Sequence, residues 1–261
     1  MRVHKIWCLT FVGVILWCAP ALGAKTAPAA EPSPMALLQR MCTYLQSLQQ
    51  FSFVARGDYD EIYSGGKKLQ YGLEMEMYVK RPGMLRVNAA GDILDKQFFL
   101  NNDTLTLYDK DKNVYATLQV PSDIGMALAK AHNEYNLRVS LTELANPHLW
   151  EFISQKITDA LYVGTVDVQG VPCYHLAFNG PDVEVQLWVR TGKKPVPLKI
   201  VFVQKKVEGE PQWSAVLSDW KTSPQLSNRL FTFTPPHGVQ KIKFVPRTQP
   251  AAPGSGKGNQ S

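Results

Sequence analysis

Apolar and polar residues alternate almost without exception between Leu69 and Lys80. One side of this segment carries Leu69, Tyr71, Leu73, Met75, Met77 and Val79, and the other carries Gln70, Gly72, Glu74, Glu76 and Lys80. A period of two is that of a β-strand, and an antiparallel strand with one face in water shows this alternation. The segment therefore predicts a strand whose apolar face other parts of the chain must cover.

The same period recurs before and after this segment. Further strands are expected at 51–59, 85–89, 98–100, 105–108, 114–120, 161–168, 171–178, 183–189, 196–203 and 213–220, with a last one near 231–233 and another within 239–245. Strand twist curls a sheet of about eleven strands toward a barrel. The predicted fold class is α+β: a strongly curved antiparallel sheet, or half-barrel, whose concave apolar face is covered by an N-terminal helix and a helical insertion.

An N-terminal helix and a helical insertion supply this cover. The helix, from Met35 to Leu48, places its apolar residues on one face. The insertion begins with residues typical of a helix start at Pro121-Ser122, and its second part, from Leu141 to Gln155, is broken at Asn146-Pro147. So small a cover over a wide sheet predicts an apolar chamber; the alternative is a fully packed core, which is the usual state of a protein interior.

The candidate ligand-binding residues follow from this geometry. On the helix and sheet they are Leu38, Cys42, Leu45, Phe53, Leu73, Met75, Met77, Leu85 and Val87, and from the lid Ile124, Leu128 and Tyr135. Methionines at neighbouring positions suit an adaptable surface, although the same residues would also make an ordinary core.

The N-terminus has the three-part pattern of a secretion signal. Arg2 and Lys5 precede an uncharged stretch, and small residues end it, so residues 1–23 are expected to be a cleavable signal peptide. Pro20 shortens the apolar part below the ~20 residues that an uncleaved anchor needs. Residues 24–34 are expected to be a linker, 35–245 one domain and 246–261 a disordered tail. This export predicts a periplasmic location.

Composition limits the partners. Cleavage after Gly23 lowers the formal net charge from +6 to +4, and this small excess is spread along the chain rather than clustered as nucleic-acid binding requires. No later segment approaches transmembrane length, so an integral membrane protein is not expected. Cys42 and Cys173 remain after cleavage, and an oxidising compartment allows either a disulfide or two buried thiols.

No motif carries catalytic or metal-binding chemistry. The mature histidines His132, His148, His175 and His237 include no pair at i, i+4, and neither HExxH nor CxxC occurs. Cys173 and His175 share a strand face but have no positioned third group. We therefore expect no catalytic residue, no metal and no cofactor.

The C-terminal half contains three segments in a characteristic order: Glu184–Arg190, Gly192 and Pro197–Phe202, and the N-terminal part contains Lys80-Arg81-Pro82-Gly83. Together these segments resemble the LolA/LolB-like periplasmic lipoprotein carriers. Within that superfamily the chain is similar to the DUF2092 group, over residues 35–245. The resemblance implies an acyl chain held between a half-barrel and a helical lid. It also implies a basic residue near the lid for cargo exchange, a role to which Arg40 is not matched.

The expected function is periplasmic binding of an acyl chain or another hydrophobic ligand, as carrier or sensor, with a lipid or a lipidated protein as partner. The alternative is a non-catalytic interaction module of the cell envelope, with a packed core and a protein partner.

Overall fold

A computed structural model describes residues 31–247 of the chain. The predicted signal peptide at 1–23 lies outside the described residues, as do most of the predicted linker and of the predicted tail. The division into these segments stays a prediction.

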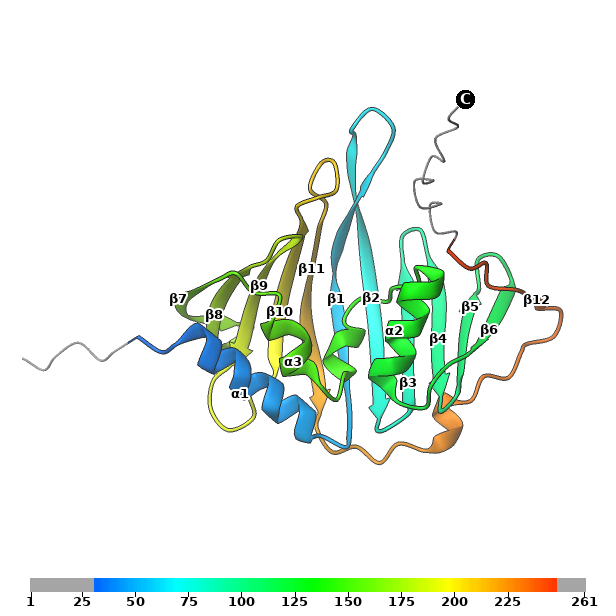
Figure 1. Cartoon of the computed structure of the whole chain (residues 1–261), viewed down its shortest axis with the longest axis horizontal. Coiled ribbons are helices and arrows are strands. Elements are labelled where there is room, and N and C mark those ends of the chain that lie inside the picture. The colour runs from blue at the N-terminus through cyan, green and yellow to red at the C-terminus, as the bar shows by residue number, and fades with distance from the viewer. Residues whose placement is uncertain (1–30, 248–261) are drawn as a thin grey trace, which may run out of the picture. The chain divides into compact units, whose positions relative to one another are not determined.

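The fold is built on one open sheet (Figure 1). Its strands are β1 (Gln50–Ile62), β2 (Lys68–Lys80), β3 (Met84–Gly91), β4 (Asp95–Asn101), β5 (Thr104–Asp109), β6 (Val114–Gln119), β7 (Asp159–Val168), β8 (Val171–Asn179), β9 (Val183–Arg190), β10 (Pro197–Gln204), β11 (Gln212–Lys221) and β12 (Gln240–Ile242). Their order is β12-β6-β5-β4-β3-β2-β1-β11-β10-β9-β8-β7. Neighbours pair antiparallel except β12, which runs parallel to β6.

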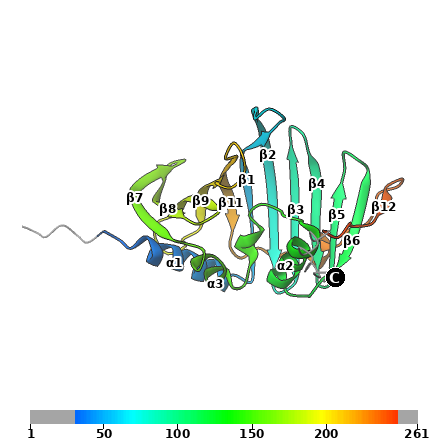
Figure 2. The same cartoon turned by 45° about the horizontal axis from the view of Figure 1, so that its top comes forward.

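The predicted curved, open sheet is confirmed, with 12 strands where about eleven were expected. Figure 2 shows the curvature, strongest toward β7 and β8. The long strands β1 and β2 join the two halves of the sheet, and their register runs without a shift from Gln50 opposite Lys80 to Ile62 opposite Lys68. The alternation between Leu69 and Val79 therefore holds one set of side chains on one face throughout.

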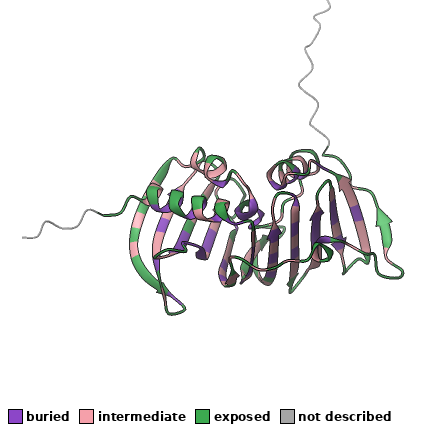
Figure 3. Cartoon of the chain, turned by 90° about the horizontal axis from the view of Figure 1, so that it is seen from below, coloured by how far each residue is buried: buried purple, intermediate pink, exposed green. Residues whose placement is uncertain are grey.

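Four helical segments lie on that face (Figures 1 and 3). They are α1 (Pro34–Ser47), α2 (Ile124–Tyr135), the short 3₁₀ helix η1 (Thr142–Ala145) and α3 (Leu149–Ser154). The Ser33 hydroxyl accepts a hydrogen bond from the Ala36 amide, and Pro34 follows in the first turn, where its missing N–H costs nothing. The predicted break in the insertion is present, since η1 ends before Asn146-Pro147 and α3 begins after it.

The strand expected near 231–233 is wrong. Asn228–Phe231 is instead a 3₁₀ helix, η2, in which Phe231 is fully buried. Phe233 then contacts the rings of Phe99, Tyr108 and Tyr115, at centroid distances of 5.2–5.4 Å. Phe99 lies on the opposite face from its buried neighbours Phe98 and Leu100 because successive side chains of a strand alternate. Aromatic packing on the far face, rather than backbone pairing, therefore holds this segment.

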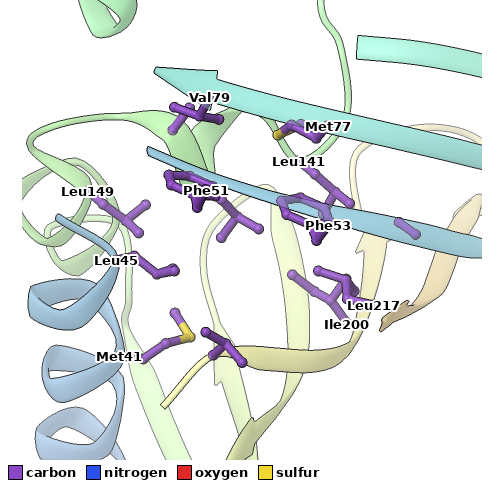
Figure 4. Packing of buried hydrophobic residues seen from close by; sticks show 14 of the residues in the cluster. Met41, Leu45, Phe51, Phe53, Met77, Val79, Leu141, Leu149, Ile200 and Leu217 are labelled. Atoms are coloured by element: carbon purple, nitrogen blue, oxygen red, sulfur yellow. The ribbon is translucent and has the colours of Figure 1, made fainter. Parts of the chain in front are cut away.

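The core fills the space between the helices and the sheet. Figure 4 shows Met41 and Leu45 of α1 and Leu149 of α3 directed at Phe51 and Phe53 of β1, Met77 and Val79 of β2, Ile200 of β10 and Leu217 of β11. Trp220 stacks on Phe53 at 4.5 Å between ring centroids. The residues labelled in Figure 4 are 0–5 % exposed, so the helices and this part of the sheet pack as one core.

Candidate functional site

Burial changes steadily along the apolar face of β2. Met75, Met77 and Val79 are at most 2 % exposed, whereas Leu73 and Tyr71 are half-buried and Leu69 is 38 % exposed. All six side chains share one face. The helices therefore cover the end of β2 near Val79 and leave the other end partly open.

The partly open end continues across the sheet as a row of facing residues. Tyr71 of β2 is opposite Tyr59 of β1, Tyr59 is opposite Trp213 of β11, Trp213 is opposite Phe202 of β10, and Phe202 is opposite Val185 of β9. Residues directly opposite each other on neighbouring strands point to the same face. All five are half-buried, and we call them the half-buried row.

Ring contacts join the half-buried row. The Tyr59 and Tyr71 centroids lie 6.0 Å apart, and those of Phe202 and Trp213 lie 5.7 Å apart. Closer to the helices on the same face, Ala215, Ile200 and Leu187 are 3–5 % exposed. Gly57 stands beside Ala215, and a Cβ there would lie 1.8 Å from the Ser214 carbonyl oxygen, so only glycine permits this approach of β1 and β11.

The covering helices are tied together at one side chain, Arg81, in the turn between β2 and β3. Its guanidinium donates to the carbonyl oxygens of Leu48, at 3.0 Å, and Leu45, at 3.4 Å, at the end of α1. It also donates to the Ala145 carbonyl at the end of η1. The next residue, Pro82, accepts from the Ile124 amide at the start of α2.

No acid forms an ion pair with Arg81 in the described part of the chain. Burial lowers the pKa of its guanidinium, with only a partial opposing effect of the Asp123 carboxylate. The charge is therefore satisfied by backbone carbonyls, which makes Arg81 the hydrogen-bonded junction of the covering segments.

The structure places the predicted ligand-binding residues in the covered part of the core. Those that are at most 2 % exposed are Leu38, Cys42, Leu45, Phe53, Met75, Met77, Leu85, Val87 and Ile124. Leu73 lies at the border with the half-buried row, and Leu128 of α2 is half-buried. Tyr135, at the end of α2, is half-buried and contacts Phe244 of the C-terminal segment at 5.7 Å between ring centroids. Their role in ligand binding stays a prediction.

The structure has two free thiols at Cys42 and Cys173, and not the disulfide that was the other possibility. Cys42 lies in α1 and Cys173 in β8, and both are fully buried. Burial and the nearby Glu151 carboxylate raise the pKa of Cys42 to about 12, and burial raises the pKa of Cys173 to about 11. Such thiols stay protonated and unreactive at neutral pH.

Two hollows in the surface lie away from these residues. One, of about 380 Å³, lies between the β4–β5 hairpin and the segment after η2, and includes Asn101, Asn102, Asp103, Thr106 and Thr232 in its lining. The other, of about 260 Å³, lies between the end of α1 and residues 222–225. Neither is lined by any predicted ligand-binding residue.

Within residues 31–247, no group of three His, Cys, Asp or Glu side chains is arranged to hold a metal ion. His175 stacks on Trp188 at 4.1 Å between ring centroids and contacts Gln186, which accounts for its place in β8 without catalysis. The helices of the described part are all too short or too polar to cross a bilayer.

Sequence reasoning missed most of the half-buried row and Arg81. Tyr71 was on the predicted apolar face and Tyr59 in a predicted strand, but their partial exposure depends on where the helices end. Trp213, Phe202 and Val185 join the row only through strand register, which no local pattern in the sequence reports. No local pattern marks Arg81, because its carbonyl partners are 33 or more positions away in the chain.

The architecture is that of an open curved sheet with helices on one face, and a solved structure shares it. An uncharacterized conserved protein from Thermus thermophilus is similar, with a TM-score of 0.50 and 12% identity over 81% of this chain and 99% of that one. The lipoprotein LppX from Mycobacterium tuberculosis has a TM-score of 0.44 and 10% identity, over 76% and 99% of the two chains. A LolA superfamily protein from Nitrosomonas europaea has a TM-score of 0.39 and 12% identity, over 77% and 98%.

The family follows from the sequence itself. Residues 34–245 match the model of the family described as "Predicted periplasmic protein (DUF2092)", and the chain belongs to that family. The predicted membership is thereby confirmed, over nearly the same residues. Among curated proteins, none matches this chain.

Proposed function

We propose that this protein binds an acyl chain or a similar apolar ligand in the periplasm, on the half-buried row and the adjoining Leu73. The observation that carries the proposal is the incomplete cover of the apolar face. The face is buried near Val79 and half-exposed at Tyr71 and Tyr59, over five adjacent strands. A continuous apolar surface that stays partly exposed on a single chain often marks a binding site.

The aromatic composition of the half-buried row suits such a ligand. Tyr, Trp and Phe side chains offer large apolar areas and lose little side-chain entropy when a ligand covers them. The Tyr63 and Tyr71 hydroxyls, 2.7 Å apart, lie at the rim, where a polar head group of the ligand would stay near water. A chain passing further inward would reach Leu73, where the half-buried row meets the packed core at Met75.

Export is the second part of the proposal. The family description agrees with a periplasmic location, and residues 1–23 have the pattern of a cleavable signal. The mature chain would then meet lipids or lipidated proteins between two membranes, as carrier or sensor. We propose no catalytic role.

The test uses the mature chain purified from the periplasm. Mass spectrometry should find co-purifying lipid, and a fluorescent fatty acid should bind and be displaced by unlabelled oleate. Leu73→Arg places a charge at the border of the row and should weaken fatty-acid binding by at least about tenfold, because a charge beside an acyl chain is costly. Gln70→Arg, on the opposite face of the same strand, is the matched control and should bind as the wild type does.

Two results would reject the proposal. One is a lipid-free chain that binds no fluorescent fatty acid although its circular dichroism shows a folded sheet. The other is equal fatty-acid binding by folded Leu73→Arg, which would place the ligand elsewhere. Export is tested separately, by N-terminal sequencing of the periplasmic chain, which should begin at Ala24.

A further inference from the structure

The two edges of the sheet differ in how much of their backbone is paired. At one edge, Gln240–Ile242 of β12 pair with Val114–Ala116 of β6 and cover its backbone. At the other edge, β7 pairs with β8 and, within residues 31–247, with no further strand. Figure 1 shows β7 at the outer end of the sheet. One side of this ten-residue strand therefore presents unpaired backbone N–H and C=O groups.

The free edge exposes apolar side chains and lacks the residues that usually block further strand pairing. Leu161, Val163 and Val166 of β7 are 57 %, 50 % and 40 % exposed. Edge strands that avoid pairing usually carry Lys or Pro, and β7 has neither. A bulge at Val163, beside Gly164 with φ +150°, bends the strand but does not remove these apolar side chains from the surface.

Acidic residues lie near both ends of this apolar stretch. Asp159 and Asp167 are exposed, and neither forms an ion pair with another described residue. The whole chain carries a formal charge of +6. The two carboxylates therefore make this edge an acidic region on a basic protein. A partner strand with basic residues at its ends would complement it.

The same two carboxylates disfavour a second copy of this chain as the occupant. Two paired β7 strands would bring four carboxylates and no basic side chain to one strand pair, and repulsion between like charges destabilises such a pair. The edge is thus better matched to a foreign strand than to itself.

We propose that β7 is a docking edge for an extended segment of another protein, with alternating apolar residues between two basic ones. Backbone hydrogen bonds to the free side of β7 supply affinity, as in other cases of strand addition. Leu161 and Val166 contact the apolar residues of the segment, and Asp159 and Asp167 pair with its basic ends. This site is separate from the half-buried row.

The experiment uses the full mature chain and a fluorescein-labelled peptide, Lys-Val-Thr-Val-Thr-Val-Thr-Lys. Its two lysines have the spacing of Asn179 and Pro172, the β8 residues that lie opposite Asp159 and Asp167 across the bulge. Fluorescence anisotropy should show saturable binding that weakens with added salt. The double variant Leu161→Lys/Val163→Lys should weaken binding at least about tenfold, since it blunts the edge with charge. Ile93→Lys, at a side chain 50 % exposed in the β3–β4 turn, is the matched control and should not change it.

Other peptides and variants distinguish strand pairing from non-specific hydrophobic binding. A peptide with proline in place of the central valine should not bind, because proline cannot complete the strand ladder. Asp159→Asn/Asp167→Asn should weaken binding and remove most of its salt dependence. Leu73→Arg should bind the peptide normally, so failure of the fatty-acid site and failure of this edge are distinguishable.

Three outcomes would overturn the proposal. They are equal binding of the proline peptide, unchanged binding by folded Leu161→Lys/Val163→Lys, and sedimentation of the wild type as a dimer that Leu161→Lys dissociates. The last outcome would assign the edge to a second copy of this chain.

Discussion

One face of the sheet behaves in two ways, packed at the end near Val79 and half-exposed at the end near Tyr71. The residue types are similar at the two ends: Phe51 and Phe53 at the first, Tyr59 and Phe202 at the second. What differs is the cover, because α1, η1 and α3 converge at the packed end, where Arg81 holds the carbonyls of α1 and η1. Apolar composition alone therefore does not distinguish a packed core from a partly open surface; the reach of the covering helices does.

The largest expected effect is that of a charge at the packed end. Met75→Arg buries a guanidinium among apolar side chains with no acid beside it, and should cost more than about 4 kcal/mol or prevent folding. Urea unfolding followed by circular dichroism measures this change. Leu73→Arg, two positions outward on the same face, should remain folded. If both variants fold equally well, the packed and the half-exposed ends are not different.

A matched pair of truncations measures the same difference more finely. Phe53→Ala removes a ring that is 2 % exposed and stacks on Trp220, and should destabilise the fold by about 3–5 kcal/mol. Phe202→Ala removes a half-buried ring and should cost about 1 kcal/mol. Equal losses of unfolding free energy would show that the half-buried row belongs to the core.

The junction at Arg81 should have an intermediate effect. Arg81→Met leaves the Leu45, Leu48 and Ala145 carbonyls without their donor and should cost about 2–4 kcal/mol, given the energy of hydrogen bonds to a charged group. Hydrogen exchange should speed up in the last turn of α1 and in η1 before it does in β1. Arg40→Met, at an exposed residue of α1, is the control. Unchanged exchange in Arg81→Met would mean that packing alone holds the covers.

These differences explain how far the sequence could predict the structure. The alternation between Leu69 and Val79 and the helical face from Met35 to Leu48 are local patterns, so the sheet, α1 and the broken insertion were correctly predicted. The segment around Phe231 also alternates, but the Phe233 ring packs on Phe99 and Tyr108 across the sheet, and a local period cannot tell aromatic packing from strand pairing.

The site could be predicted only in part for a related reason. The twelve predicted ligand-binding residues were taken from apolar faces. Of the nine that lie on the helix and the sheet, eight are packed in the core. An apolar face in the sequence indicates which residues must be covered, but not how completely the structure covers them. Burial of Met75 and exposure of Leu69 depend on which part of β2 the helical segments cover, and Arg81 binds the last carbonyls of α1 and η1, which are 33 or more positions away in the chain. Only the three-dimensional structure contains this information.

The smallest expected effect is chemical and leaves the fold intact. Cys42 and Cys173 are fully buried, and burial raises the pKa of each thiol, to about 12 and about 11, so neither should react with Ellman's reagent at pH 8 in the native chain. A cysteine at the other end of the face, introduced as Val185→Cys in the half-buried row, should react within minutes. Because the native thiols stay silent, the mature variant should release one equivalent before denaturation and all three after it. Slow reaction of Val185→Cys would mean that the row is covered, and no free native thiol after denaturation without reductant would mean that Cys42 and Cys173 are bonded in the periplasm. Added oleate should protect Val185→Cys and leave the two buried thiols unchanged, which ties the exposed end of the face to the ligand that it is proposed to bind.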